Sequence, residues 1–135
     1  MDTATPLSAD GATASAPRVL VVDDEPVFRD AARQLLERRG YDVVAEAGCA
    51  ASALDAVEHF APEAVLLDVR LGDDDGFDVC GNLTRARPGL AVLLASTGDY
   101  EHYHELVVSC GARGFVSKTR LVDTDLGQFW PRPGH

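Results

Sequence analysis

The sequence predicts an α/β fold, a doubly wound five-stranded parallel sheet with helices on both faces. Short, continuously apolar runs alternate along the chain with stretches whose apolar residues recur at helical spacing. Strands that are apolar on both faces are typical of a parallel sheet covered by helices on each side. Five such units, the last with a short helix, favour a single domain for a chain of 135 residues.

Five apolar runs are the predicted strands, because each is short and rich in branched aliphatic residues. They are residues 19–22, 43–45, 64–67, 91–95 and 114–117. The stretches between them carry apolar residues three and four positions apart, which predicts an amphipathic helix in each. The predicted helices are residues 26–39, 50–60, 77–86 and 100–110.

Helix signals support these boundaries. Pro26 suits the first turn of the first helix, and Gly40 suits the position just after its end. In the second helix, the spacing of Leu54, Val57 and Phe60 predicts that these three side chains face the core.

The two ends of the chain differ from this pattern. Residues 1–17 are rich in Ala, Ser, Thr and Pro without apolar periodicity, so we expect a disordered leader. The folded domain is expected to cover residues 18–130, with a last short helix that stops before Pro131. Residues 131–135 are then a C-terminal tail.

Composition and charge exclude several classes of protein. The formal net charge is −10, which disfavours direct binding of DNA or RNA by this chain. No apolar run approaches the length of a membrane span, and the N-terminus lacks a signal-peptide pattern, so we expect a cytoplasmic protein with no membrane partner. The three cysteines are far apart in sequence, which argues against a disulfide framework or a zinc site. Cys80 and Cys110 lie on apolar helix faces and are expected to pack in the core.

Polar residues stand where four of the predicted strands end. They are Asp23 and Asp24 after the first strand, Asp68 after the third, Ser96 and Thr97 after the fourth, and Lys118, the only lysine, after the fifth. In doubly wound folds the carboxyl ends of the strands share one rim, where ligands bind. Three neighbouring carboxylates cannot all stay ionised without a cation, and oxygen ligands beside a phosphate favour Mg²⁺.

The segments around these residues resemble the receiver domain of bacterial two-component response regulators. The resemblance covers roughly residues 18–120 and rests on VLVVDDEP, VLLDVRLGDDDGF, LLASTGD and GFVSK. The spacings from Asp68 to Ser96 and to Lys118 are similar to those common in the family. The implied fold is the flavodoxin-like receiver fold, and the chain looks like a single-domain response regulator.

The resemblance also implies residue roles. Asp68 would be phosphorylated, and Asp23, Asp24, Asp68 and the main-chain carbonyl of Arg70 would hold Mg²⁺. Lys118, Ser96 and Thr97 would bind the phosphoryl group, while Ser96 and Phe115 would form the switch.

The implied function is phosphoryl transfer from a sensor histidine kinase, or a phosphotransfer protein, to Asp68. Phosphorylation would switch the face formed by residues 100–130 for a downstream protein target. The chain would catalyse only its own phosphorylation and dephosphorylation, as a monomer or a phosphorylation-dependent dimer.

Two positions depart from the family pattern. Gly72 stands where a proline is common after the phosphorylated aspartate, so that loop is expected to be more flexible. Thr119 replaces the proline that commonly follows the lysine, so we expect a trans Lys118–Thr119 peptide.

Other functions remain as alternatives. The chain could be the receiver fragment of a DNA-binding response regulator whose output domain is absent. A more remote alternative is a haloacid-dehalogenase-type phosphatase that forms an aspartyl phosphate, but Arg70 stands where its second aspartate is needed. An FMN site would require phosphate-binding donors after the first strand in place of acids, and an EF-hand loop would require an acid at Leu71.

Overall fold

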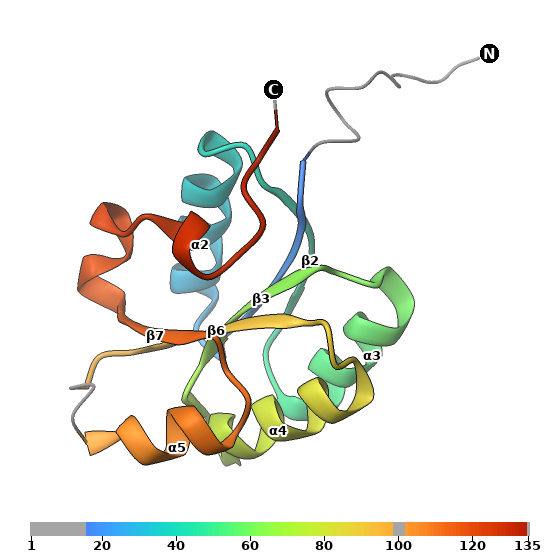
Figure 1. Cartoon of the computed structure of the whole chain (residues 1–135), viewed down its shortest axis with the longest axis vertical. Helices are drawn as coiled ribbons and strands as arrows, with labels where there is room; N and C mark the ends of the chain where they lie inside the picture. Colours follow the sequence, from blue (N-terminus) through green and yellow to red (C-terminus); the bar gives the residue numbers. More distant parts are fainter. Residues whose placement is uncertain (1–15, 99–101, 135) are drawn as a thin grey trace.

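A computed structural model describes residues 16–98 and 102–134, and it contains the predicted five-stranded parallel sheet. The strand order is β2-β1-β3-β6-β7 (Figure 1). The strands are β1 (Arg18–Val22), β2 (Asp42–Ala47), β3 (Ala64–Asp68), β6 (Ala91–Ser96) and β7 (Gly114–Ser117). All neighbouring strands of this sheet are parallel, so their carboxyl ends lie along one rim, and the chain order reverses at β1.

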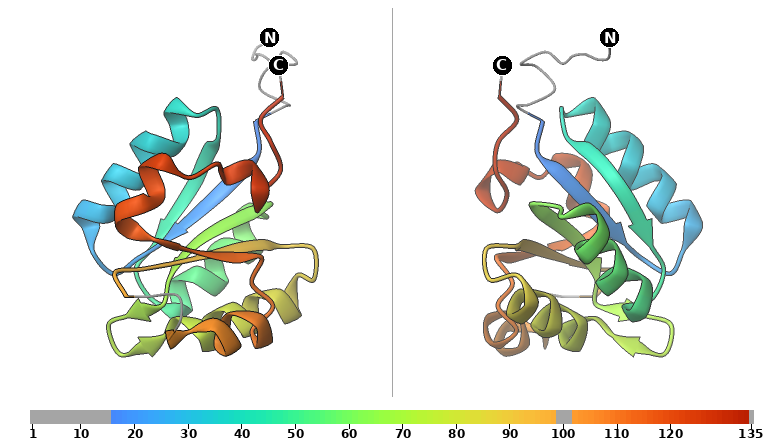
Figure 2. Two further views of the ribbon diagram at one scale, coloured as in Figure 1. Left: turned by 60° about the vertical axis from the view of Figure 1, so that its left-hand side comes forward. Right: turned by 90° about the vertical axis from the view of Figure 1, so that its right-hand side faces the viewer.

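Helices cover both faces of the sheet (Figure 2). They are α2 (Pro26–Arg38), α3 (Ala50–Phe60), α4 (Gly76–Ala86) and α5 (His104–Ser109). The predicted short last helix is present as two 3-10 segments, η2 (Lys118–Asp123) and η3 (Leu126–Gln128). The α5 helix is shorter than predicted, and Tyr100, at the start of the predicted helix, lies outside the described residues.

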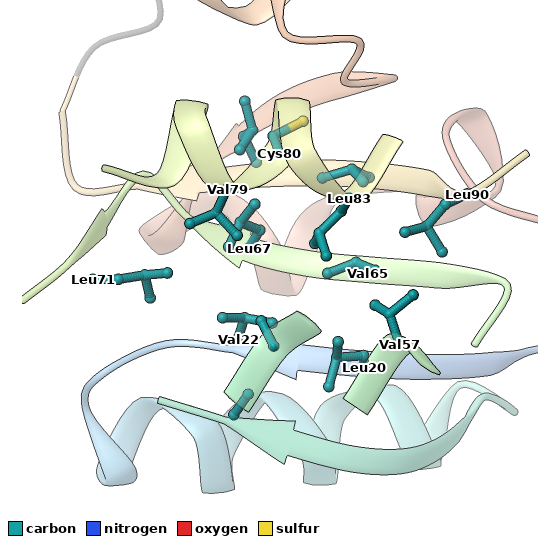
Figure 3. Packing of buried hydrophobic residues seen from close by; sticks show 14 of the residues in the cluster. Leu20, Val22, Val57, Val65, Leu67, Leu71, Val79, Cys80, Leu83 and Leu90 are labelled. Atoms are coloured by element: carbon teal, nitrogen blue, oxygen red, sulfur yellow. The ribbon is translucent and has the colours of Figure 1, made fainter. Parts of the chain in front are cut away.

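Two apolar layers form the core, one on each face of the sheet. Alternate side chains of β1 and β3 point to opposite faces, as the two-residue repeat of a strand requires. Leu20, Val22 and Val65 pack toward α3 and α4 (Figure 3), whereas Val19 and Val21 pack toward α2 and the C-terminal 3-10 segments.

The prediction for the inner face of α3 is wrong at two of three positions. Val57 is buried, but Leu54 and Phe60 are 39% and 40% exposed. The buried positions are instead Ala53 and Ala56 beside Val57. Small side chains let a helix lie close to the sheet, and hydrophobicity alone gives such alanines too little weight.

A small antiparallel hairpin follows β3 and shapes the rim of the sheet. It pairs β4 (Arg70–Leu71) with β5 (Asp74–Asp75), and Gly72 turns the chain at a positive φ of 62°. The carboxylates of the hairpin are structural, since Asp74 accepts the N–H of Ala50 at 2.9 Å and Asp75 accepts the N–H of Phe77 at 2.8 Å.

Gly76 is required where the hairpin returns to β3. A Cβ atom at this position would lie 2.2 Å from the carbonyl oxygen of Asp68. Any larger residue would push α4 away from the residue that ends β3.

The C-terminal segment closes the amino end of the sheet. Trp130 is 3% exposed, and its ring lies edge-on to Tyr41 with 5.4 Å between the ring centroids. Arg132, in the predicted tail, pairs with Asp125.

Most of the predicted leader lies outside the described residues, but the carbonyl of Pro17 accepts the N–H of Asp42. Within residues 16–98 and 102–134, no helix is both long and apolar enough to cross a membrane.

Candidate functional site

Three carboxylates meet at the carboxyl ends of β1 and β3. Asp23, Asp24 and Asp68 each offer an oxygen, and these oxygens lie within 4.8 Å of one another. The neighbouring strands β1 and β3 bring them together, because their parallel register ends both strands at the same rim. Asp23 is fully buried, Asp68 is nearly so, and Asp24 is exposed to solvent.

Asp68 is held from two sides. Its Oδ1 accepts the main-chain N–H of Arg70 at 3.1 Å, and its Oδ2 accepts a hydrogen bond from Lys118 Nζ at 3.2 Å. Burial raises the pKa of Asp68, and the negative charge of Asp23 adds to this effect, while the donors Arg70 and Lys118 oppose it. The net effect of burial and these neighbours favours the neutral form of Asp68.

Lys118 is the cation of the site. Its Nζ lies 2.7 Å from Asp23 Oδ2 and 3.2 Å from Asp68 Oδ2. Burial acts to lower the pKa of Lys118, but the two carboxylates outweigh it and raise the pKa. The ammonium also lies 4.3 Å from the centroid of the Phe28 ring, which is a cation–π contact.

The donor set fits a divalent metal ion. Within the described residues, Asp23 Oδ2 is a buried oxygen without a hydrogen-bond partner, although it faces Lys118 as an ion pair. Three ionised carboxylates beside one ammonium would leave an excess of two negative charges. All the side-chain ligand atoms are oxygens, so a hard divalent cation would neutralise the excess negative charge.

The other predicted phosphoryl-binding residues lie at the end of β6. Ser96 is buried, and its Oγ accepts the N–H of Gly98 at 2.9 Å. Thr97 is exposed. Residue 70 is an exposed arginine, so this position offers no carboxylic acid of the kind that a dehalogenase-type phosphatase needs. The described residues hold no cis peptide, so the Lys118–Thr119 bond is trans as predicted.

Phe115, the predicted switch residue, belongs to a row of aromatic rings. Its centroid lies 5.7 Å from that of Tyr103, which in turn lies 5.3 Å from that of Phe77. Tyr103 also covers Gly98, where a Cβ atom would lie 3.2 Å from the tyrosine hydroxyl. The row therefore connects the chain just beyond Ser96 with the start of α5.

The sequence did not predict two of these contacts. Phe28 and Tyr103 fall in predicted helices without any assigned role, and the structure places Phe28 against Lys118 and Tyr103 over Gly98. A side chain at or just before the start of a helix can reach a distant strand end only after the helix has packed, and periodicity along the sequence does not predict such a contact.

Comparison with known proteins agrees with this geometry. Residues 19–124 match the family model of the response regulator receiver domain. The chain is similar to the sensory transduction protein LytT of Bacillus cereus, with 37% identity over 112 residues that cover 79% of this chain and 45% of the relative. The chain spans about half the length of the curated relatives it matches.

Solved structures resemble the chain as well. A LuxR-family two-component response regulator from Aurantimonas superimposes with a TM-score of 0.77 and 30% identity, covering 84% of this chain and 81% of the other. A response regulator from Burkholderia pseudomallei, solved with a phosphorylated aspartic acid and a calcium ion, gives a TM-score of 0.76 at 27% identity. That match covers 84% of this chain and 66% of the other.

Proposed function

The chain belongs to the family of response regulator receiver domains, and from this premise we propose that Asp68 is its phosphoryl acceptor. The observation that carries the proposal is that Asp68 contacts Lys118 and has a carboxylate oxygen within 4.8 Å of oxygens of Asp23 and Asp24. In a related response regulator from Burkholderia pseudomallei an aspartic acid is phosphorylated and a calcium ion is present.

The reaction is an in-line transfer from phosphohistidine of a sensor kinase or a phosphotransfer protein. An Asp68 carboxylate oxygen attacks phosphorus, the P–N bond breaks, and the electron pair returns to the imidazole. Little covalent chemistry is left for other side chains, so positioning and charge neutralisation dominate. The N–H of Arg70 orients Asp68, and Lys118 exchanges its contact with Asp68 Oδ2 for one with a phosphoryl oxygen.

Magnesium is the proposed metal. Asp23, Asp24 and Asp68 would hold it, together with the main-chain carbonyl of Arg70. Bound Mg²⁺ would supply positive charge to the transferring phosphoryl group. The chain would act only on itself, catalysing the gain and loss of its own phosphoryl group.

Phosphorylation would be read out through Ser96 and the aromatic row. The Ser96 hydroxyl would leave the N–H of Gly98 and donate to a phosphoryl oxygen. Tyr103 covers Gly98 and stacks beside Phe115, so this exchange would bias the packing of both rings and of α5. A downstream protein would then bind the face that α5, β7 and the 3-10 segments form.

DNA binding is not part of the proposal for this chain. Some curated relatives are named as transcriptional regulators, but the chain spans about half of their length. With a net charge of −10, these residues would not bind duplex DNA at physiological salt.

Phosphorylation with acetyl phosphate tests the assignment of Asp68. Wild type should gain one phosphoryl group in Mg²⁺ and none in EDTA, as measured by intact mass. Asp68→Asn should gain none, because an amide is not a nucleophile. Asp55→Asn, which removes an exposed acid on α3, is the matched control and should be labelled like wild type. Undiminished labelling of Asp68→Asn would refute the assignment.

A further inference from the structure

Two thiols from different helices meet on the side of the sheet away from α2. Cys80 lies in the middle of α4, and Cys110 follows the last residue of α5. The Cys80 thiol donates to the carbonyl oxygen of Cys110 at 3.4 Å. Figure 3 shows Cys80 with its sulfur atom among the core residues of α4. All three cysteines of the chain lie within the described residues and are free thiols.

A hydroxyl fixes the same two backbones to each other. Thr84 Oγ1 lies 2.9 Å from the carbonyl oxygen of Cys80 and 3.2 Å from that of Cys110. The end of α5 is therefore held against α4 by the Cys80 thiol and the Thr84 hydroxyl together. These contacts hold the two cysteines beside each other at the junction of α4 and α5.

The two thiols differ in exposure and acidity. Cys80 is fully buried, whereas Cys110 is partly exposed and lines a groove of about 390 Å³ between α4 and α5. The neighbouring Cys80 thiol lowers the pKa of Cys110 to about 7, and Cys110 in turn raises the pKa of Cys80. Cys110 is thus the accessible nucleophile, with a buried thiol beside it.

We propose that Cys110 and Cys80 form a peroxide-sensitive thiol pair, whose oxidation to an intramolecular disulfide ties α5 to α4. Cys110 first releases its proton to solvent. The thiolate attacks one oxygen of hydrogen peroxide, the O–O bond breaks, a sulfenic acid forms, and the departing hydroxide takes up the released proton as water. Cys80 sulfur then attacks the sulfenyl sulfur, the S–O bond breaks, and the departing hydroxide takes the Cys80 proton. In total, two thiols and one peroxide give one disulfide and two waters.

The consequence of the disulfide follows from the position of α5. Tyr103, directly before this short helix, contacts Phe115 and covers Gly98, while Cys110 stands at its other end. A covalent tie at Cys110 restricts the movement of α5 that phosphorylation of Asp68 would cause. This regulatory meaning rests on the proposed function, but the thiol chemistry itself does not.

Mass spectrometry of a Cys49→Ser protein tests the chemistry, because only the proposed pair then remains. Hydrogen peroxide should lower the intact mass by about 2 Da, the loss of two hydrogens, and dithiothreitol should reverse the change. A Cys110→Ser variant in the same background should not lose this mass. A Cys80→Ala variant, which spares the partly exposed thiol, should accumulate a Cys110 sulfenic acid that dimedone traps. Disulfide-linked dimers alone, or further oxidation of Cys110 with no loss of two hydrogens, would overturn the proposal.

A second measurement separates this inference from the assignment of Asp68. Asp68→Asn in the Cys49→Ser background should oxidise at the parent rate, since the pair lies outside the acidic site. In the protein with Asp68 intact, the NMR shifts of α5 caused by beryllofluoride should be smaller after oxidation and recover with dithiothreitol. Equal shifts in both redox states would overturn the regulatory part. Absence of any shift in the reduced protein would contradict the phosphorylation switch, while leaving the disulfide chemistry intact.

Discussion

The two ends of the sheet are built from opposite kinds of contact. At the carboxyl end, Asp23 and Asp68 are buried beside the single ammonium of Lys118. At the amino end, Tyr41 and Trp130 close the core with two packed rings.

This difference indicates that the amino end of the sheet contributes mainly to stability, whereas the carboxyl end is built for function. Burial of large apolar side chains at the amino end stabilises the fold. At the carboxyl end the clustered carboxylates, which Lys118 neutralises only in part, lower its stability. A ligand that neutralises the carboxylates should therefore raise the free energy of unfolding through the carboxyl end. Substitutions at the amino end should change stability but not phosphorylation, whereas substitutions at the carboxyl end should change metal binding and phosphorylation.

Removing the closing ring should give the largest loss of stability. Trp130→Ala should lower the free energy of unfolding by about 3–5 kcal/mol, because a fully buried aromatic side chain is lost. Urea unfolding measures the change, and Val122→Ala at an exposed site is the control. Folded Trp130→Ala should still accept a phosphoryl group from acetyl phosphate. A stability loss as small as that of the control would contradict the role given to the amino end.

Magnesium should give the next largest effect, in the opposite direction. At a concentration a hundred times its dissociation constant, Mg²⁺ should raise the free energy of unfolding by about 2.7 kcal/mol, because it binds the folded site and not the unfolded chain. Thermal or urea unfolding with Mg²⁺ and with EDTA measures this difference. Asp24→Asn should reduce it and Asp55→Asn should not, so an equal effect in both variants would place the ion elsewhere.

Replacing Asp68 should stabilise the metal-free protein in a pH-dependent way. Burial raises the pKa of Asp68 above its ordinary 3.8. The contribution of Asp68 to the free energy of unfolding is thus fully present below its ordinary pKa of 3.8, and it is lost as pH rises through the pKa of Asp68 in the folded protein. Asp68→Asn, which stays neutral, should gain about 1 kcal/mol over wild type at neutral pH and little below the ordinary pKa. Urea unfolding in EDTA at several pH values checks this, and a constant difference across pH would refute it.

The cation–π contact should have the smallest effect. Phe28→Leu should lower the free energy of unfolding by roughly 0.5–1 kcal/mol through loss of the ring beneath the ammonium. It should also slow phosphorylation by acetyl phosphate, because Lys118 is held less firmly. Phe28→Tyr keeps an aromatic face and is the matched control. Equal rates in the leucine and tyrosine variants would show that the ring does not position Lys118.

The sequence by itself determined the sheet and the residues that end its strands. Apolar runs specify buried parallel strands locally, and a strand's last residue lies at the rim whatever the helices do. For this reason the local pattern of the chain was enough to assign Asp23, Asp68, Ser96 and Lys118 to one edge.

Only the tertiary structure decided which side chains from other elements contact the residues at the strand ends and which helix positions are buried. It turned Leu54 and Phe60 outward in favour of Ala53 and Ala56, formed the last helix as 3-10 segments, and used Asp74 and Asp75 as hydrogen-bond acceptors. It also placed the Phe28 ring against the ammonium of Lys118 and brought the Cys80 thiol within hydrogen-bond distance of the Cys110 carbonyl oxygen. Hydrophobic periodicity describes one element at a time, whereas each of these contacts depends on how closely two elements pack, which is set by side chains distant in sequence.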